Sequence, residues 1–224
     1  MEITILKNIY GANDQKADEL RSLLKKNKVF MANIIGSPGC GKTALLEKIL
    51  HDLGKKFRIA VIEGDIATDR DARRLQRFDT PIALINTDGA CHLEALSIEK
   101  AIQSFNLKEL DIILIENVGN LVCPAEFDIG EHAKIAMVST TEGDDKPAKY
   151  PLLFREASSV ILSKMDLLEH TDFNKKAFHI DLQRLNGELP VFEISSTKPQ
   201  GLGRFYQWLE TKYFELYKKN GTWK

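Results

Sequence analysis

One segment of the sequence combines glycines, a lysine and a hydroxyl in a pattern that binds phosphates. It has the form G-x-x-x-x-G-K-T and comprises Gly36, Ser37, Pro38, Gly39, Cys40, Gly41, Lys42 and Thr43. Glycines let backbone N–H groups turn toward phosphate oxygens, and a following helix adds partial positive charge at its N-terminus. We expect Lys42 to reach the outer phosphates, the Thr43 hydroxyl to ligate Mg²⁺, and Cys40 to fill a variable position. The pattern favours a nucleotide site over a plain glycine-rich turn.

Two acidic residues that follow apolar segments are candidates for the other side of a magnesium site. Asp65 comes shortly after the apolar run 57–62, and Glu116 directly follows the run 110–115. Mg²⁺ takes few protein carboxylates and keeps several waters, so one or both are expected to serve, directly or through water. A turn or capping residue is the alternative for Asp65, whereas an acid directly after an apolar strand is harder to explain structurally.

A third set of residues is a candidate for base recognition. Lys164 and Asp166 follow Ser163 and the apolar run 158–162, in partial agreement with the N-K-x-D segment by which GTPases recognise guanine. A carboxylate accepts hydrogen bonds only, so it suits the N1–H and amino group of guanine, a pair of donors that adenine does not present in that arrangement. Ser195, after the run 191–194, begins a segment that resembles the base-backing loop of GTPases more loosely.

Cysteine and histidine residues offer a possible metal site. Cys91 and His92 are adjacent, and Cys123 follows Glu116 by seven positions. Thiolate and imidazole suit Zn²⁺ or Ni²⁺, but a structural zinc site needs four ligands, so the site is either open or completed by a second chain. The alternative is that Cys91 begins a helix and Cys123 is buried beside Pro124. Because Cys123 lies where a GTPase senses the γ-phosphate, nucleotide state is expected to load or release a metal there.

These residues require a scaffold that brings strand ends together, and the hydrophobic pattern predicts one. Apolar runs alternate with helical segments, and they are continuous rather than alternating, which is typical of a parallel sheet covered on both faces. Ligands bind at the carboxyl ends of such strands. The predicted strands are 29–35, 57–62, 81–85, 110–115, 135–139, 158–162 and 191–194. The predicted helices are 13–28, with Asn13 as its N-cap, and 43–53, 69–77, 91–105, 173–185 and 202–217.

Composition sets further limits. The chain has 224 residues, with 31 lysines and arginines against 32 acidic residues and hence a formal charge of −1. This balance disfavours broad nucleic-acid binding, and three cysteines argue against a secreted disulfide scaffold. No apolar run approaches a membrane span, and residues 1–10 do not form a signal peptide, so we expect a cytoplasmic protein. We predict an N-terminal strand and helix extension, residues 1–28, packed on one P-loop GTPase domain, residues 29–224.

Taken together, five segments resemble the HypB family of nickel-inserting GTPases used in [NiFe]-hydrogenase maturation. They are residues 36–43, 63–71, 91–93, 116–124 and 164–166, of which 116–124 is the most specific. The resemblance spans the chain from about Leu6 and implies a three-layer P-loop NTPase fold with a mostly parallel sheet. It implies Mg²⁺ among Thr43, Asp65 and Glu116, and a Zn²⁺ or Ni²⁺ site of Cys91, His92 and Cys123 near a GTP-dependent homodimer interface. It assigns guanine recognition to Lys164 and Asp166, and it implies a HypA-like nickel donor and a hydrogenase large-subunit precursor as partners.

The chain departs from some members of that family and leaves alternatives open. It has neither an N-terminal Cys-x-x-Cys site nor a His-rich tract, so nickel storage is not expected, and Ser163 replaces the asparagine of the base-recognition motif. No glutamine takes an obvious water-positioning place, which predicts slow hydrolysis. Lys146 either approaches nucleotide or a partner chain, or is a solvated surface lysine. The alternatives are a urease-type UreG GTPase, a P-loop small-molecule kinase with a lid containing Arg70, Arg73 and Arg74, and a non-catalytic metal-binding module.

Overall fold

The computed structural model describes residues 11–65, 74–198 and 201–217 and contains one seven-stranded sheet. All neighbouring strands are parallel, in the order β3-β2-β4-β1-β5-β6-β7. The strands are β1 (Phe30–Gly36), β2 (Ile59–Asp65), β3 (Ile82–Asn86), β4 (Ile112–Glu116), β5 (Ala133–Ser139), β6 (Ser159–Ser163) and β7 (Val191–Glu193). The sheet therefore confirms the predicted α/β class, with a strand at each predicted position.

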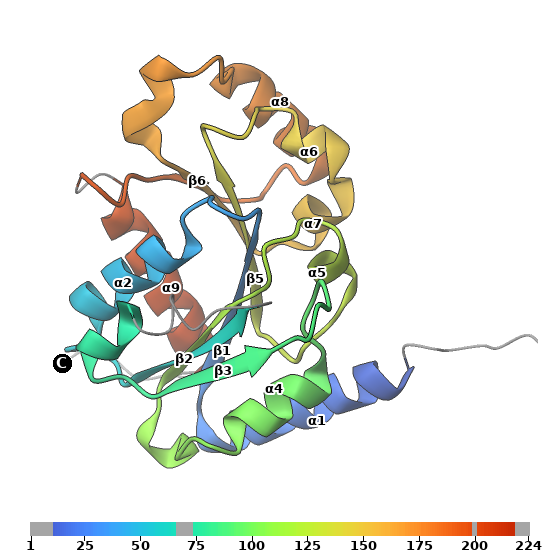
Figure 1. Ribbon diagram of the computed structural model, residues 1–224, viewed down its shortest axis with the longest axis vertical. Helices are drawn as coiled ribbons and strands as arrows, with labels where there is room; N and C mark the ends of the chain where they lie inside the picture. Colours follow the sequence, from blue (N-terminus) through green and yellow to red (C-terminus); the bar gives the residue numbers. More distant parts are fainter. Residues whose placement is uncertain (1–10, 66–73, 199–200, 218–224) are drawn as a thin grey trace, which may run out of the picture.

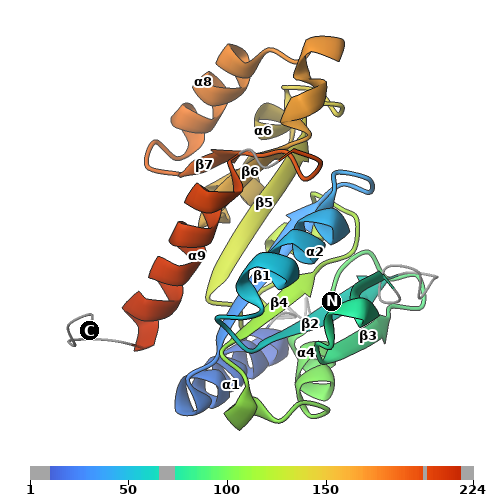
Figure 2. The same ribbon diagram turned by 90° about the vertical axis from the view of Figure 1, so that its left-hand side faces the viewer.

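Helices cover both faces of this sheet, giving the predicted three layers (Figures 1 and 2). The α-helices are α1 (Gly11–Asn27), α2 (Lys42–Leu53), α4 (Ala95–Ile102), α5 (Cys123–Glu126), α6 (Lys146–Lys149), α7 (Pro151–Glu156), α8 (Lys175–Leu185) and α9 (Leu202–Tyr217). Single 3-10 segments are η1 (Gln76–Phe78), η2 (Leu107–Glu109) and η3 (Met165–His170). One face of the sheet packs against α2 and α9, and the other packs against α1 and α4 at one end and against α5, α7 and α8 at the other.

The pleat of the strands decides which residues meet which layer. Along β1, Ile34 faces the α2 layer, whereas Met31 and Ile35 face the opposite layer. Because successive side chains alternate between faces, Asn33 also points away from α2, into the layer of α1, α4 and α5. In β4 the same alternation directs Glu116 toward α2, on the side of Leu114.

Two helix predictions are corrected by the structure. Asn13 does not cap α1, which begins at Gly11; its side-chain oxygen instead accepts a hydrogen bond from the backbone N–H of Ala95, 2.9 Å away, at the start of α4. The predicted helix 91–105 accordingly begins only at Ala95, and Cys91 precedes it in a loop, so the idea that Cys91 begins a helix is wrong. Leu93, which precedes the helix, packs closely against Gly64 of β2.

Other differences concern short segments. Most of the predicted helix 69–77 lies outside the described residues; Arg74 and Leu75 are helical as predicted, and the 3-10 turn η1 follows them. Helices α5, α6 and α7 were not predicted, because segments of four to six residues are too short to show helical periodicity. Each has a proline in its first turn, where the missing N–H costs nothing. The division of the chain at residue 28 stays a prediction.

Candidate functional site

The phosphate loop connects the end of β1 to α2, as the sequence pattern predicts. Gly39 and Gly41 have φ angles of +77° and +104°, a region that L side chains rarely adopt. The Lys42 Nζ donates to the carbonyl oxygens of Gly36 and Ser37, at 3.3 and 3.4 Å. This ammonium group is therefore held over the loop by acceptors that belong to the loop itself, close to where phosphate oxygens would replace them.

Cys40 is a structural member of this loop. Its side chain is fully buried, and burial raises the pKa of the thiol to about 11, so it remains protonated and unreactive at neutral pH. A Cβ at Gly36 would lie 2.6 Å from the Cys40 Sγ, so the thiol needs glycine at that position. The Ser163 hydroxyl donates to the Cys40 carbonyl at 2.6 Å. Ser163, which replaces the asparagine of the guanine motif, thus ties the end of β6 to the phosphate loop.

Oxygen ligands meet on one side of the adjoining cleft, which has a volume of about 470 Å³. The Thr43 hydroxyl donates to Glu116 Oε1 at 3.1 Å, and the Lys42 Nζ lies 3.9 Å from the same oxygen. The buried Glu63 of β2 also lines the cleft. A hydroxyl with two carboxylates is a donor set that fits Mg²⁺. Asp65 ends β2, but its side chain lies outside the described residues, so its predicted role stays a prediction.

The candidate base-recognition residues lie together beyond the other end of the phosphate loop. Asp166 Oδ1 accepts a hydrogen bond from the Ser195 hydroxyl at 2.6 Å, and Oδ2 accepts one from Thr197 at 2.9 Å. These hydroxyls lower the pKa of Asp166, so the carboxylate stays charged. The backbone of Lys164 is left-handed, with φ of +56°, and its carbonyl accepts a hydrogen bond from Thr140 at 2.8 Å. The segment after β7 therefore orients an acceptor that is fixed in place and anionic.

Cys91, His92 and Cys123 converge, although 32 positions separate the two cysteines. One candidate ligand atom from each lies within 4.8 Å of the others, and the Cys91 Sγ is 3.6 Å from the His92 Nδ1. The hydrogen bond between the two thiols, together with burial, raises the pKa of Cys91. The His92 ring stacks on Phe127 with centroids 3.8 Å apart. The set is partly open to solvent and offers soft ligands suited to nickel or zinc.

One loop connects this metal-ligand cluster to the phosphate loop. Gly119 packs so closely on Pro38 that a Cβ there would lie 2.7 Å from the proline Cγ. The next residue, Asn120, donates through its side chain to the Cys91 carbonyl at 3.2 Å, and its side-chain oxygen accepts from the Val122 N–H at 2.9 Å. The backbone that carries Cys123 therefore touches both the phosphate loop and the segment that carries Cys91 and His92.

Other predicted residues have more ordinary surroundings. The Lys146 Nζ lies 5.6 Å above the Tyr150 ring. Arg74 lines the cleft and pairs with Glu47 at 2.9 Å, whereas Arg70 and Arg73 lie outside the described residues.

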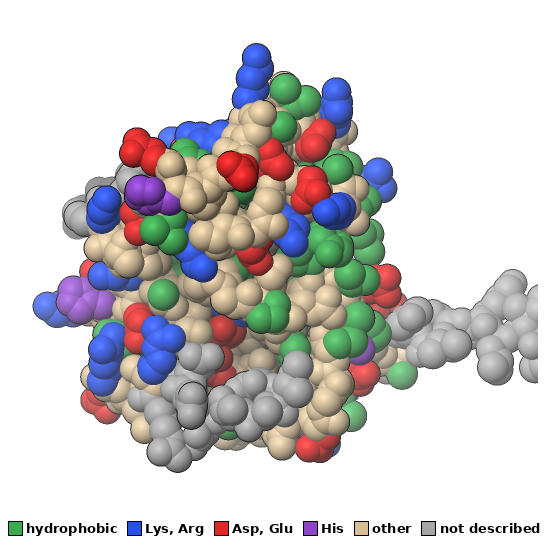
Figure 3. All heavy atoms as spheres, turned by 45° about the horizontal axis from the view of Figure 1, so that its top comes forward, with side chains coloured by type: hydrophobic (Ala, Val, Ile, Leu, Met, Phe, Trp, Pro, Cys, Tyr) green, Lys and Arg blue, Asp and Glu red, His purple; other side chains and the backbone are tan. Residues whose placement is uncertain are grey.

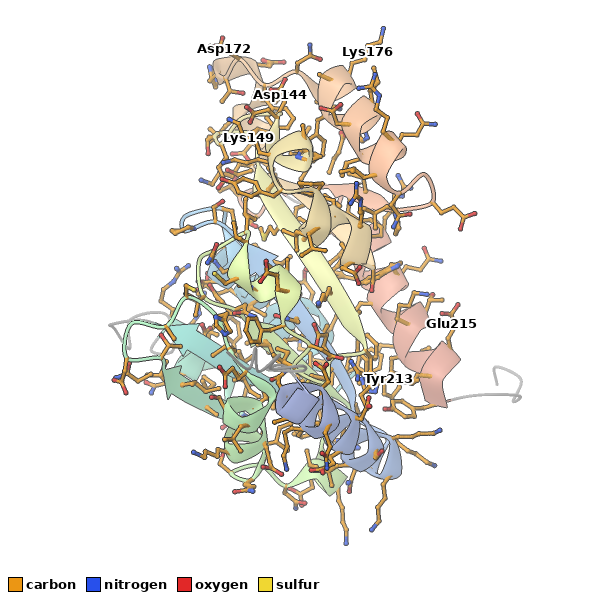
Figure 4. The ribbon with its side chains drawn as sticks, turned by 90° about the vertical axis from the view of Figure 1, so that its right-hand side faces the viewer. Asp144, Lys149, Asp172, Lys176, Tyr213 and Glu215 are labelled. Carbon is orange, nitrogen blue, oxygen red and sulfur yellow. The ribbon has the colours of Figure 1, made fainter. Side chains whose placement is uncertain are left out.

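Three labelled positions show how the outer helices are arranged. Asp144 accepts a hydrogen bond from the backbone N–H of Asn174 at 2.9 Å, which ties the loop after β5 to the start of α8 (Figure 4). On α9, Tyr213 packs on the core while Glu215 is exposed (Figure 4). Acidic and basic side chains are intermingled over the face shown in Figure 3, in agreement with the balanced composition.

Three residues near these sites were not predicted in the roles that the structure gives them. Glu63 belongs to the cleft because it shares the strand face of Val61, a position that follows from strand alternation once the strand is extended to Asp65. Asn13 joins two loops: besides Ala95, it contacts Asp128, whose carbonyl accepts from its side-chain amide at 2.7 Å. Asn33 is the polar residue in an otherwise apolar strand, a signal that only tertiary structure explains.

Comparison with known proteins gives consistent matches. A family model described as CobW/HypB/UreG, nucleotide-binding domain, matches residues 30–193. A protein of Azotobacter vinelandii named hydrogenase maturation factor HypB is 42% identical over 208 residues, which cover 93% of this chain and 69% of the relative. A protein of Helicobacter hepaticus named hydrogenase/urease maturation factor HypB is 39% identical over 222 residues, covering 97% of this chain and 91% of the relative.

A solved structure agrees with these relatives. The crystal structure of HypB from Helicobacter pylori in complex with nickel matches with a TM-score of 0.88 and 39% identity, over 95% of this chain and 100% of that one.

Within the part of the chain that the structure describes, no helix combines the length and the apolar character needed to cross a membrane.

Proposed function

Because this chain belongs to the HypB family of hydrogenase maturation factors, within the CobW/HypB/UreG group, we propose that it hydrolyses GTP and delivers nickel to a [NiFe]-hydrogenase. Nickel is the cargo in this proposal. The names of the relatives favour hydrogenase over the urease-type alternative as the destination, and the Helicobacter hepaticus relative carries both names. A kinase would leave the paired Asp166 and Ser195 beyond the phosphate loop without a purpose.

A single observation carries the proposal: one short stretch of backbone joins a nucleotide cleft to a cluster of nickel-type ligands. Gly119 lies against Pro38 of the phosphate loop, and Cys123 follows four residues later beside Cys91 and His92. A nucleotide that moves Gly119 is therefore expected to move Cys123 as well. This arrangement supports loading or release of the metal in step with nucleotide state.

Nucleotide hydrolysis at this cleft depends mainly on positioning and charge. Lys42 and the backbone N–H groups of the loop neutralise phosphate oxygens, and the N-terminus of α2 adds its partial charge. Thr43, Glu63 and Glu116 are the described residues that would hold Mg²⁺, and Asp65 remains a candidate; the ion supplies charge neutralisation of the outer phosphates. No glutamine is among the described residues that line the cleft, so we expect slow turnover, which suits a switch.

The metal cluster supports a role for a second copy of the chain. Three protein ligands leave at least one coordination position open for Zn²⁺ or Ni²⁺, and an exposed site on a twofold axis doubles its ligand set. We propose a GTP-dependent homodimer, a HypA-like protein as nickel donor, and the hydrogenase large-subunit precursor as recipient. Sedimentation of the protein with a GTP analogue and with GDP, each with and without nickel, tests this: equal masses in all four conditions contradict the dimer proposal.

The nucleotide proposal is tested by binding of labelled GTP in the presence of excess unlabelled GTP or ATP. We expect GTP to displace the label and ATP to have little effect, because Asp166 accepts from the two donors of guanine. Equal competition by ATP would refute guanine recognition. Phosphate release from GTP, with and without Mg²⁺, then measures whether the bound nucleotide is hydrolysed.

The metal proposal is tested by titrating nickel and zinc into the wild-type protein and into Cys91→Ala and Cys123→Ala. Each variant removes one thiolate of the cluster, so we expect the stoichiometry at this site to fall, with loss of the thiolate-to-nickel charge-transfer absorption. Cys40→Ala is the matched control, because Cys40 is buried in the phosphate loop and should leave that absorption unchanged. Unchanged stoichiometry in both test variants would remove the site.

A further inference from the structure

Three polar side chains form a hydrogen-bonded bridge inside the core, on the face of the sheet opposite α2. Asn33 lies at its centre in β1, with Asn117 on one side and Glu131 on the other; they are 0%, 1% and 6% exposed. Asn117 Nδ2 donates to Asn33 Oδ1 at 3.1 Å, and Asn33 Nδ2 donates to Glu131 Oε1 at 3.2 Å. We call these three residues the Asn33 bridge.

The orientation of the central amide follows from its partners. The Glu131 carboxylate accepts hydrogen bonds, so the Asn33 NH₂ group must face it, and the Asn33 carbonyl must then face the amide of Asn117. The remaining acceptors are also occupied: Glu131 Oε2 accepts from the Ile129 N–H, and Asn117 Oδ1 accepts from the Val118 N–H, both at 2.9 Å. The bridge therefore has one satisfied arrangement, and a shift at either end breaks a buried hydrogen bond.

The two ends of the bridge are also the two ends of one loop. Residues 117–131 contain Gly119, which packs on Pro38, and Cys123, one of the candidate metal ligands. They also contain Phe127, which stacks on His92. Lys134, in the strand that follows, also contacts this loop. Its Nζ donates to the Ala125 carbonyl at 3.0 Å and lies 3.9 Å from Glu131 Oε1. Asn33 thus joins the beginning and the end of the loop that connects the two sites.

A packing role alone does not account for these residue types. An apolar trio would fill the same space without removing a carboxylate from water, and such replacements are often neutral or stabilising. Hydrogen bonds add a defined geometry, because the two ends of the loop either keep their bonds to Asn33 or lose them. A loop closed in this way moves as one piece, whereas a loop with an open base absorbs a displacement at Gly119 before it reaches Cys123.

We propose that Asn33 is a positioning residue that couples nucleotide state to the metal site by holding the two ends of the loop 117–131 together. The proposal rests on the proposed function, because it concerns how the two ligands of that function affect one another. Asn33 touches neither ligand. Its removal is therefore expected to leave the binding of each ligand alone nearly intact and to reduce the effect of one on the other.

The test measures the apparent nickel affinity of the full chain by chelator competition, once with GDP and once with a non-hydrolysable GTP analogue. The ratio of the two affinities is the coupling, and couplings in allosteric proteins are typically about 5- to 150-fold. We expect Asn33→Leu, which removes both hydrogen bonds at similar volume, to bring the ratio below about twofold. Because leucine at this position leaves two buried polar groups without a partner and threatens folding, Glu131→Gln provides a second break: its single amide oxygen cannot accept from both the Asn33 NH₂ group and the Ile129 N–H.

A reversed bridge and a matched core variant separate positioning from stability. In Asn33→Asp combined with Glu131→Gln, the new carboxylate accepts from Asn117 and from the introduced glutamine amide, so the bridge re-forms with opposite polarity and the same total charge. We expect the coupling to return to within about threefold of the wild-type ratio. The control is Ile113→Ala, which leaves a cavity in the same core cluster as Ile129 of the loop but removes no hydrogen bond of the bridge.

The outcomes are distinct. The proposal is supported if the ratio of nickel affinities falls toward one in Asn33→Leu and Glu131→Gln, recovers in the double variant and stays unchanged in Ile113→Ala. An unchanged ratio in Asn33→Leu or Glu131→Gln, or an equal loss in Ile113→Ala, overturns it. If the wild-type protein binds both ligands with a ratio of one, the coupling in the proposed function is absent and the Asn33 proposal is overturned with it. If the wild type binds no guanine nucleotide, the proposed function fails at the earlier step.

Discussion

Asp166→Asn is the most direct perturbation of the candidate base site, because it replaces one acceptor oxygen by a donor at nearly constant volume. In the folded chain the carboxylate is fixed by hydroxyl donors on both sides, Ser195 at 2.6 Å and Thr197 at 2.9 Å. The same hydroxyls lower the pKa of Asp166, so the group that meets the base is an anion at neutral pH. The substitution removes that charge and one acceptor position together.

The size of the effect follows from the hydrogen bonds at stake. Guanine donates from N1–H and from its amino group, and a hydrogen bond to a charged acceptor contributes about 1.5–3 kcal/mol net. Asp166→Asn loses one of these bonds and reduces the other to a neutral one, which together amounts to about 2.5–4.5 kcal/mol, or a GTP affinity lower by about 10²- to 10³-fold. Ser195→Ala removes only one orienting hydroxyl, so it should cost about 1 kcal/mol, or about fivefold.

The assay is equilibrium binding of labelled GTP, with ATP affinity measured in parallel. We expect Asp166→Asn to lose GTP affinity while ATP affinity stays low, so that the preference for guanine nearly disappears. Asp172→Asn makes the same chemical change on an exposed residue of the same region, labelled in Figure 4, and should have no effect. The reasoning is refuted if Asp166→Asn keeps GTP affinity within about threefold of wild type, or if Asp172→Asn loses as much.

Three further predictions concern stability and the connecting loop. Burial lowers the pKa of His132 to about 4, whereas an unfolded histidine titrates near 6.5. The unfolded chain therefore binds more protons between these values, and the free energy of unfolding should fall by about 3 kcal/mol as pH drops through that window. His132→Asn, measured by urea unfolding at pH 7 and pH 4.5, should remove most of this dependence. Asn13→Ala should lower the free energy of unfolding in urea by about 1–3 kcal/mol, because it loses the cap of α4 and a bond to Asp128. Gly119→Ala should weaken nucleotide binding at least about tenfold in the same binding assay, because the new methyl group would lie 2.7 Å from a Pro38 carbon and displace the phosphate loop.

Each of these variants has a counterpart that should leave the measured property unchanged. His170→Asn replaces an exposed histidine and should keep the pH dependence of stability. Asn27→Ala removes a half-buried side chain that donates to the Leu23 carbonyl within α1, and Gly203→Ala adds a Cβ with nothing within 4 Å. Equal effects of a variant and its counterpart would contradict the mechanism given for that variant.

The strands and the phosphate loop could be predicted from the sequence because both are local signals. Continuous apolar runs such as residues 110–115 report burial on both faces, and the glycine, lysine and threonine pattern of residues 36–43 encodes its own backbone geometry. Helix boundaries were less predictable where the deciding contact is distant. Helix α4 begins at Ala95 because Asn13, 82 positions earlier, caps it, and no local pattern contains that information.

Among the site residues, proximity could be expected from the sequence where it depends on the shared edge of the sheet, whereas the roles of these residues stay predictions. Thr43 and Glu116 could be expected near one another, since each follows a strand that opens on the same edge of a parallel sheet. Glu63 was missed because placing it in the cleft requires knowing where β2 ends and which face of the sheet each side chain of β2 points to. Asn33 was missed for another reason: its partners lie in loops that become neighbours only because β4, β1 and β5 are adjacent in the sheet.

The short connection between the two candidate sites limits how independently they can behave. Gly119 and Cys123 are four residues apart, so even fully extended backbone spans at most about 14 Å between them. Asn120 restricts this backbone further, because its side chain is hydrogen-bonded both to the Cys91 carbonyl and to the Val122 N–H. If a phosphate group displaces Gly119, few backbone torsions between Gly119 and Cys123 are therefore free to change and absorb that displacement. It is either passed on to Cys123 or breaks the contacts of Asn120 with the segment of Cys91, and either outcome would alter the arrangement of the proposed metal ligands.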